Sequence, residues 1–402
     1  MTKRQRIVAA LVLLFAVLAF SGCSVQAPPE LFTAIKAGDL DQTKTILETN
    51  PKSANSKDEA GNTPLLLAAS AGNKDLCEVL IAGGAALEAQ GQHGTALHEA
   101  AIGNHKDIAE LLINKRANVN AKDKSGNTPL YYASTFGWGG KRNKNDWDIA
   151  RSLVSNGAEV NMKSGSGDTP LHSAALYAPE EIVRLFIEKG ADVNVKLSSP
   201  GWPRKRNSGP APLHNACMRS DKNAEIVELI IDAGAEINAK CYSEQADGWT
   251  PLYFACLHEN TEAVELLIAK RAKVNTISDM GNTPIHYAPN AEIAQLLIDN
   301  HANIYYRNKE GYSPLHNAVK GGHSDVAKLL IAKRAYVTTI NYQGTSLLHE
   351  AAITNQKEMV ELLIAEGVNI NAKDKAGMTP ARVAEKAGHD DIADLLRQYS
   401  GK

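Results

Sequence analysis

The chain has 402 residues, of which 44% are hydrophobic and 22% are charged. This composition is ordinary for a globular protein that buries a sizeable core, and it excludes the disordered and fibrous classes. The 43 basic and 45 acidic residues give a formal net charge of -2, so no whole-molecule field attracts nucleic acid or anionic lipid.

The first element in chain order is an export signal. Lys3, Arg4 and Arg6 precede an uncharged apolar run over residues 7–20. This run is shorter than the roughly 20 residues that a bilayer-spanning helix needs, which is typical of a signal peptide that is removed from the mature protein. We therefore expect residues 1–22 to be the signal peptide.

The residues that end this segment, Phe20-Ser21-Gly22-Cys23, resemble the lipobox of bacterial lipoproteins. The resemblance implies that Cys23 becomes the N-terminus and carries the lipid, followed by a short linker over 24–28. Ser24, where inner-membrane lipoproteins often carry Asp, favours the outer membrane with the protein facing the periplasm. Because Phe20 stands where the family usually has Leu, a simple secretory signal and a soluble periplasmic protein stay open as the alternative.

One phrase, Thr-Pro-Leu-His, recurs along the rest of the chain at intervals of 30 to 42 residues. After each copy come an Ala-rich stretch, an apolar helical pattern such as that over 182–187, and a Gly-Ala-Asp-Val-Asn segment such as that over 190–194. Recurrence at a near-constant period predicts a repeat architecture. The copies begin at Thr63, Thr95, Thr128, Thr169, Ala211, Thr250, Thr283, Ser313, Ser346 and Thr379.

Each copy of the phrase predicts two short helices. Thr is a favoured N-cap and Pro suits the first helical position, so Thr169-Pro170 marks the start of a first helix. A second helix then buries Ile182 and Phe186, and Gly190 suits a left-handed helix stop. Helices of two or three turns are marginal alone in water, so their stability must come from stacking on neighbouring repeats.

The repeat resembles the ankyrin repeat, and the likeness covers residues 29–399. It implies an all-α repeat solenoid of about eleven helix-turn-helix units with loop or β-hairpin fingers, in a curved stack. Residues 29–62 resemble an N-terminal capping unit, 63–378 contain nine repeats, and 379–402 form a C-terminal capping repeat. At about 8–10 Å per unit, the stack would be on the order of 100 Å long.

Three insertions interrupt the period, at 138–147, 196–210 and 241–249. The first lies between the two helices of one repeat, whereas the second lies in the loop before a first helix. Both are basic, but these two places are at opposite ends of a unit. We therefore interpret their charges as solvated loop residues and not as one phosphate site.

The predicted binding site is the centre of the concave face, because family members bind partners there and through their loop tips. Large apolar and aromatic residues gather at these positions and in the adjoining loops, and such residues are enriched at interface hot spots together with Arg and Met. The alternative is that the long loops fold back and bury them. The predicted partner-binding residues are Tyr132, Phe136, Trp138, Leu176, Tyr177, Trp202, Met218, Arg219, Trp249, Phe254, Leu257 and Tyr287.

Cysteines and histidines are explained by the repeat. Cys217 and Cys256 hold the same position in adjacent repeats, about 8–10 Å apart, beyond the roughly 7 Å that a disulfide allows between Cα atoms. We expect buried free thiols there, in place of Ala. The repeat histidine is expected, from the resemblance, to bond its own Thr and the neighbouring loop; these residues are His98, His172, His214, His286, His316 and His349.

No catalytic, metal or cofactor site is predicted. His98-Glu99 and His349-Glu350 begin like a zinc-protease motif, but Ile102 and Ile353 stand where the second His is required. No phosphate-binding loop or nucleophile elbow appears either.

Together these features predict a non-enzymatic, envelope-tethered module that acts as a monomer and binds a protein partner. The partner would be a secreted toxin, an effector or an envelope enzyme, while membrane contact would come only through the N-terminal lipid and nucleic acid would not bind. The main alternative is an immunity or inhibitor lipoprotein that neutralises a toxic enzyme in the periplasm. A purely structural spacer is a further possibility.

Overall fold

The computed structural model describes residues 29–135, 147–165, 167–197, 209–242 and 247–401. The chain divides into two compact units, Met1–Glu159 and Val160–Lys402. The expected signal peptide and Cys23 lie outside the described residues. Within the described ranges, no helix has the length and apolar character required to span a bilayer.

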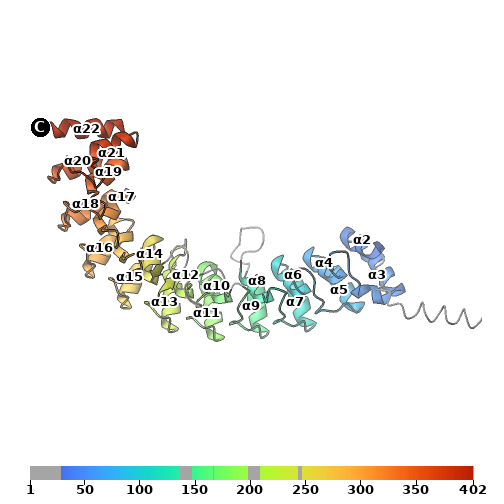
Figure 1. The fold of residues 1–402 in the computed structure, drawn as a ribbon. Coiled ribbons are helices and arrows are strands. Elements are labelled where there is room, and N and C mark those ends of the chain that lie inside the picture. Colours follow the sequence, from blue (N-terminus) through green and yellow to red (C-terminus); the bar gives the residue numbers. More distant parts are fainter. Residues whose placement is uncertain (1–28, 136–146, 166, 198–208, 243–246, 402) are drawn as a thin grey trace, which may run out of the picture. The chain divides into compact units, whose positions relative to one another are not determined.

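The first unit contains four pairs of antiparallel helices among its described residues, and a short 3₁₀ helix, η1. Figure 1 shows α4, α6 and α8 side by side in one layer and α5, α7 and α9 in the other, and the packing of successive helices agrees with this view. The elements are α2 (Pro29–Ala37), α3 (Leu40–Thr49), η1 (Pro51–Asn55), α4 (Pro64–Ser70), α5 (Lys74–Ala82), α6 (Ala96–Ile102), α7 (Lys106–Asn114), α8 (Pro129–Ser134) and α9 (Asp148–Ser155).

The second unit has the same two-layer arrangement, with seven pairs among its described residues, and the predicted all-α repeat solenoid is confirmed. The first helix of its Thr283 repeat, η2, is a single 3₁₀ turn. The elements are α10 (Pro170–Tyr177), α11 (Glu180–Glu188), α12 (Pro212–Cys217), α13 (Ala224–Asp232), β1 (Cys241–Tyr242), β2 (Asp247–Trp249), α14 (Pro251–Leu257), α15 (Thr261–Ala269), η2 (Pro284–Tyr287), α16 (Ala291–Asp299), α17 (Pro314–Gly321), α18 (Ser324–Ala332), α19 (Leu347–Ile353), α20 (Lys357–Ala365), α21 (Pro380–Lys386) and α22 (Asp390–Ser400).

The first helices begin at the predicted residues, which are Thr or Ser except for Ala211 before α12, and the structure adds one refinement. Thr128 caps α8 in the expected way, because its hydroxyl accepts from the backbone N–H of Tyr131. Where the repeat carries His, the ring takes over part of the cap. The Nδ1 atom of His172 accepts from the backbone N–H of Thr169 at 3.2 Å and lies 2.8 Å from its hydroxyl. The His side chain therefore satisfies a backbone donor that a helix start leaves unpaired.

The second helices end in the left-handed conformation, as the sequence predicts at Gly190, which has φ +83°. A glycine adopts this conformation without the steric cost of a Cβ atom. Three other repeats use arginine at the same place, Arg116, Arg271 and Arg334, with φ between +66° and +68°. These positions carry backbone strain that the glycine repeats avoid.

The core lies between the two helix layers, and small residues let the layers approach. Ala174 and Ala175 of α10 are completely buried, as are Ile182 and Phe186 of α11. Burial of a side chain such as Ile182 or Phe186 contributes about 1.5–3 kcal/mol to the free energy of unfolding. Stacking therefore compensates for the weak intrinsic stability of such short helices.

Five of the six repeat histidines connect their repeat to the next through Nε2, as predicted. The exception is His316, whose buried Nε2 has no hydrogen-bond partner among the described residues. His98 Nε2 lies 3.2 Å from the carbonyl oxygen of Asn127 in the following finger, where a finger is the tight turn that precedes a first helix. Burial lowers the pKa of these rings, to about 4 for His214, His286 and His316. A neutral ring with Nδ1 accepting and Nε2 donating fits both contacts.

A second connection between repeats uses asparagine at the segment after the second helix. Asn194 donates from Nδ2 to the carbonyl of Gly234 at 3.0 Å and accepts from the backbone N–H of Glu236 at 2.8 Å. We call this pair of bonds the asparagine bridge. Both bonds recur at Asn55, Asn120, Asn161 and Asn275.

The fingers share one local turn but differ in how they contact each other. In the first unit Asp123 N–H donates to the Asn127 carbonyl and closes a turn around Gly126. In the second unit neighbouring fingers are also joined by backbone bonds, from Lys309 N–H to the Met280 carbonyl at 3.0 Å and from Tyr342 N–H to the Glu310 carbonyl at 2.9 Å. Four successive fingers of this unit form a continuous ladder, because Lys375 N–H likewise donates to Gln343.

The insertions are described in part. The base of the second is closed by bonds between Leu197 and Pro210 and between Gly209 and Leu197. The third forms an antiparallel hairpin of β1 and β2, in which Cys241 pairs with Trp249. Residues 138–146 of the first lie outside the described residues. The four described cysteines are buried and free, as expected for Cys217 and Cys256: they are Cys77, Cys217, Cys241 and Cys256.

Candidate partner-binding surface

Most of the predicted binding residues that the structure describes lie along the first helices of the second unit. Consecutive first helices α10, α12, α14 and η2 contact each other, so residues at corresponding positions form one row. We call this the first-helix row. Its members are Leu176 and Tyr177 on α10, Met218 and Arg219 just after α12, Trp249 just before α14, Phe254 and Leu257 on α14, and Tyr287 on η2.

The remaining predicted residues do not belong to this row. Tyr132 lies on α8 in the first unit, where its hydroxyl donates to Asp123 Oδ2 at 2.6 Å and accepts from Asn127. Burial and the Asp123 carboxylate raise the pKa of Tyr132 to about 12. The phenol therefore holds the finger in front of its helix. Phe136, Trp138 and Trp202 lie outside the described residues.

An aromatic cluster occupies the part of the row around α14. The Trp249 ring stacks on Tyr253 with centroids 5.9 Å apart, and it lies 5.7 Å from Phe254 and 5.3 Å from Tyr287. Phe254 is only 7% exposed and also contacts the His214 ring edge-on. The expectation of an exposed Phe254 is therefore wrong, because the neighbouring rings cover it.

Arg219 also differs from the expectation, since its side chain is only 4% exposed. Its guanidinium forms two hydrogen bonds with the Asp221 carboxylate and donates to the Ala175 carbonyl in the preceding repeat. A buried charge needs such partners, and they lower the pKa of Asp221. Arg219 therefore connects two repeats, and little of its surface is left for a partner.

Two members of the row are exposed enough for contact. Tyr177 is 45% exposed and Leu257 is 43% exposed, while Leu176, Met218, Trp249 and Tyr287 are half-buried. Exposed large apolar groups beside a rigid, packed aromatic cluster are typical of an interface anchor. The row thus offers a mixed aromatic and aliphatic surface on fixed helices.

Trp147 corrects the interpretation of the first insertion. Aromatic residues in the loops beside the concave face were expected to be accessible, yet Trp147, the last residue of this insertion, is buried directly before α9. Here the alternative interpretation, that inserted segments bury their aromatic residues, is the one that holds.

The sequence interpretation missed a second group of exposed residues between 277 and 342. They lie on the fingers and on the stems, where a stem is the segment between a second helix and the following finger. They are Ile277, Met280, Tyr305, Tyr336, Ile340 and Tyr342. A signal for them is present in the repeat itself, because Tyr305 stands where the asparagine bridge has Asn275 in the preceding repeat. A tyrosine at a repeat position that is otherwise polar is a signal from which this region could have been predicted.

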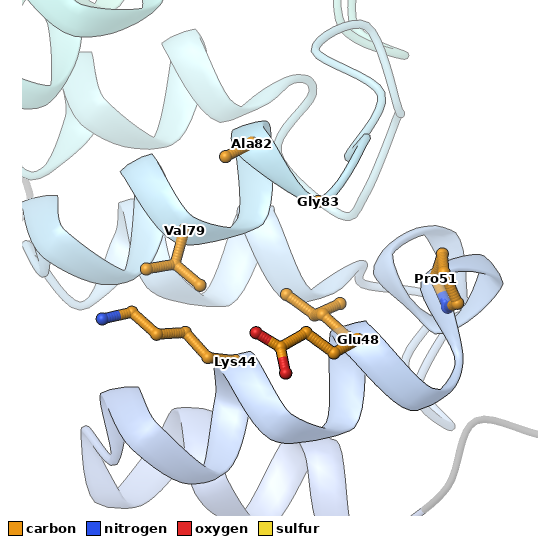
Figure 2. A pocket seen from close by; sticks show the side chains of 7 residues that line it. Lys44, Glu48, Pro51, Val79, Ala82 and Gly83 are labelled. Carbon is orange, nitrogen blue, oxygen red and sulfur yellow. The ribbon is translucent and has the colours of Figure 1, made fainter.

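A hollow also lies between α3 and α5 in the first unit (Figure 2), with a volume of about 450 Å³. Gly83 opens it, since this glycine has an ordinary φ of -76° and yet lacks the side chain that Lys115 supplies one repeat later. A Cβ atom at Gly83 would lie 3.1 Å from Leu47 Cδ1. The walls are mostly apolar, and Lys44 and Glu48 of α3 also line the hollow.

Among the described residues, no three His, Cys, Asp or Glu side chains are grouped to hold a metal ion. Burial raises the pKa of the thiols of Cys77 and Cys241 to about 12 and that of Cys217 and Cys256 still further. These thiols stay protonated at neutral pH and are weak nucleophiles.

The profile of the family described as "Ankyrin repeats (3 copies)" matches the chain in overlapping segments that run from residue 31 to residue 402. The chain therefore belongs to the ankyrin-repeat family. Ankyrin repeats form protein–protein interaction modules, so the fold defines a class of protein that binds other proteins.

Curated proteins from animals and yeast are similar to parts of the chain. Human transient receptor potential cation channel subfamily A member 1 is 26% identical over 58% of this chain and 17% of its own length. Ankyrin repeat and KH domain-containing protein mask-1 of Caenorhabditis elegans is 29% identical over 73% of this chain and 10% of its own length.

A smaller relative, the probable 26S proteasome regulatory subunit p28 of Saccharomyces cerevisiae, is 32% identical over 30% of this chain and 53% of its own length. The chain thus matches about half or less of each of these three relatives. The similarity lies in the repeats.

Proposed function

We propose that this protein is an exported, lipid-anchored binding module of the bacterial envelope, which holds a protein partner on its first-helix row and catalyses no reaction. The main supporting observation is the row itself, in which Tyr177 on α10 and Leu257 on α14 are exposed and a packed aromatic cluster lies around α14. The apolar run over 7–20 and the lipobox-like sequence ending at Cys23 support export and anchoring at the outer membrane.

The row suits a protein surface better than a small molecule. Its two exposed members lie on separate helices, α10 and α14, whereas a small ligand requires a concave pocket that encloses most of its surface. Protein interfaces instead use a few large apolar anchors surrounded by polar groups. Phe254 and Arg219 support the row from beneath, because each contacts a neighbouring repeat or ring.

The site is tested with the double variant Tyr177→Ser, Leu257→Ser, which removes the exposed anchors and leaves the buried cluster intact. Capture of envelope proteins by the purified protein, followed by mass spectrometry, identifies the partner. Its affinity should then fall about tenfold or more in the variant, as for loss of two interface anchors. The matched control is Tyr399→Ser, which removes a similarly exposed tyrosine from α22. Equal affinities of wild type, double variant and control would rule out the row as the site.

Anchoring is tested separately. Labelled fatty acid should enter the wild-type protein but not Cys23→Ser, and this variant should move from the membrane fraction to the soluble periplasm or remain unprocessed. Absence of label from the wild type would contradict the lipid anchor and leave the binding function untouched. If the captured partner is a toxic enzyme that the protein inhibits, the module acts as an immunity or inhibitor protein.

A further inference from the structure

Two neighbouring finger stems of the second unit expose large side chains. Exposure alternates along the first stem, where Tyr305, Arg307 and Lys309 are exposed and Ile304 and Asn308 are buried. The next stem repeats the pattern. We call the exposed set the tyrosine finger surface: Tyr305, Arg307, Lys309, Tyr336, Ile340 and Tyr342.

Direct contacts join the two stems into one surface. The Tyr305 and Tyr336 rings have centroids 4.9 Å apart. The Arg307 guanidinium lies 5.3 Å from the centroid of the Tyr342 ring and donates to the Ile340 carbonyl. The backbone bond from Tyr342 to Glu310 fixes the second stem against the first. The surface is therefore held in place before any partner binds.

The tyrosine pair occupies positions that elsewhere stabilise the stack. In the preceding repeat Asn275 accepts from the backbone N–H of Asn303 at 2.8 Å, which is half of an asparagine bridge. Tyr305 and Tyr336 are the counterparts of these two residues, and they are 45% and 64% exposed. A polar connection has been exchanged for exposed aromatic rings, which contribute little to the core and are enriched at interfaces.

The two stretches of chain that carry this surface are positively charged, although the chain as a whole carries -2. The two stretches 300–311 and 333–345 contain four cations and one anion, Glu310, which gives a net charge of +3. None of the four cations forms an ion pair with a described carboxylate. They are Arg307, Lys309, Lys333 and Arg334.

We propose that the tyrosine finger surface binds an acidic, extended segment of a partner protein. Carboxylates of this segment pair with Arg307 and Lys309, while its apolar side chains lie on Tyr305 and Tyr336. This inference rests on the proposed protein-binding function and adds to it a second surface with defined ligand chemistry. A polypeptide fits better than nucleic acid, because four cations are few for a phosphate backbone and the whole-chain charge opposes its approach.

The probe is a labelled twelve-residue peptide of alternating Glu and Leu, titrated with the purified protein and followed by fluorescence anisotropy. A Lys-Leu peptide of the same length tests the charge requirement. Single-stranded DNA and vesicles containing phosphatidylglycerol test the other anionic partners. The Glu-Leu peptide should bind, and added salt should weaken its binding because the exposed charges become screened.

The decisive variant is Tyr305→Asn, Arg307→Gln, which removes one ring and one cation. The new Asn can restore an asparagine bridge, so the variant should stay folded, as checked by circular dichroism. Affinity for the Glu-Leu peptide should fall about tenfold. The matched control is Tyr399→Asn, Arg397→Gln, which makes the same kind of change on the surface of α22 of the same unit and should leave this affinity unchanged.

Several results would overturn the inference. The first is that the finger variant and the wild type bind the Glu-Leu peptide with equal affinity. The second is that the wild type binds the Lys-Leu peptide as tightly as the Glu-Leu peptide. The third is that DNA or vesicles bind more tightly than the Glu-Leu peptide. Loss of the captured envelope partner in the first-helix-row variant, with no loss in the finger variant, would uphold the proposed function and reject the tyrosine finger surface as a site for that partner's acidic segment.

Discussion

The fingers of the two units share a turn but differ in their surroundings. Gly126 in the first unit has φ +83° and no atom within 4 Å of the place where a Cβ would lie, whereas Gly311 in the second unit has φ +85° and the Tyr342 nitrogen at 2.8 Å. The turn is a local property of its few residues. The ladder between fingers depends on the neighbouring repeat, and it gives the second unit a fixed surface on which exposed tyrosines can be held.

The largest difference between the two units is expected in their stability at acidic pH. The folded-state pKa of the repeat histidines lies below their ordinary value of 6.5, so between pH 6.5 and about 4 the unfolded chain binds protons that the folded chain does not. The free energy of unfolding therefore falls as pH falls through this window, by on the order of 3 kcal/mol for each of His214, His286 and His316.

Five of the six repeat histidines belong to the second unit, and His98 alone to the first. Hydrogen exchange measured at pH 7 and pH 5 should show a larger loss of protection in α12–α19 than in α4–α7. Similar losses in both units would contradict this assignment of the acid sensitivity.

Glycine substitutions in the fingers should destabilise the two units by different amounts. Gly126→Ala and Gly311→Ala impose the same backbone strain of about 1–2 kcal/mol. Gly311→Ala adds a clash with backbone atoms of the next finger, so it should lose about 1–3 kcal/mol more. Denaturant titration of both variants measures the difference, and Gly377→Ala, in the last finger with nothing within 4 Å, should behave like Gly126→Ala.

Removal of an asparagine bridge should have a smaller and more uniform effect. Asn120→Ala in the first unit and Asn194→Ala in the second each break two hydrogen bonds to the following repeat. Each should lower the free energy of unfolding by about 1–2 kcal/mol, since the freed groups are partly reached by water. A large difference between the two variants would show that the bridge is not an equivalent connection in both units.

The smallest effect is expected for Tyr305→Asn alone, which places an asparagine at a repeat position where the asparagine bridge is missing. A new pair of bonds to the following repeat should raise the free energy of unfolding by up to about 1 kcal/mol. Thermal denaturation detects this change. A clear loss of stability would indicate that the stacked rings of Tyr305 and Tyr336 support the fold as well as a contact surface.

Much of the fold followed from the sequence because its determinants are local and repeated. The Thr-Pro phrase marked the helix starts, and the repeat histidine and Gly190 behaved as expected. The binding residues were harder to predict, because exposure depends on neighbouring repeats. Nothing in the sequence of α14 alone shows that Trp249 and His214 pack on Phe254, or that Asp221 and Ala175 bind the Arg219 guanidinium.

The reactivity of the buried cysteines can report how often the helices around them separate. Their thiols can meet a water-borne alkylating reagent only when the surrounding helices separate, and each then reacts at a rate set by that opening. Cys77 samples the first unit, and Cys217, Cys241 and Cys256 sample the second. Labelling followed by mass spectrometry would therefore time the opening of each unit in the native chain.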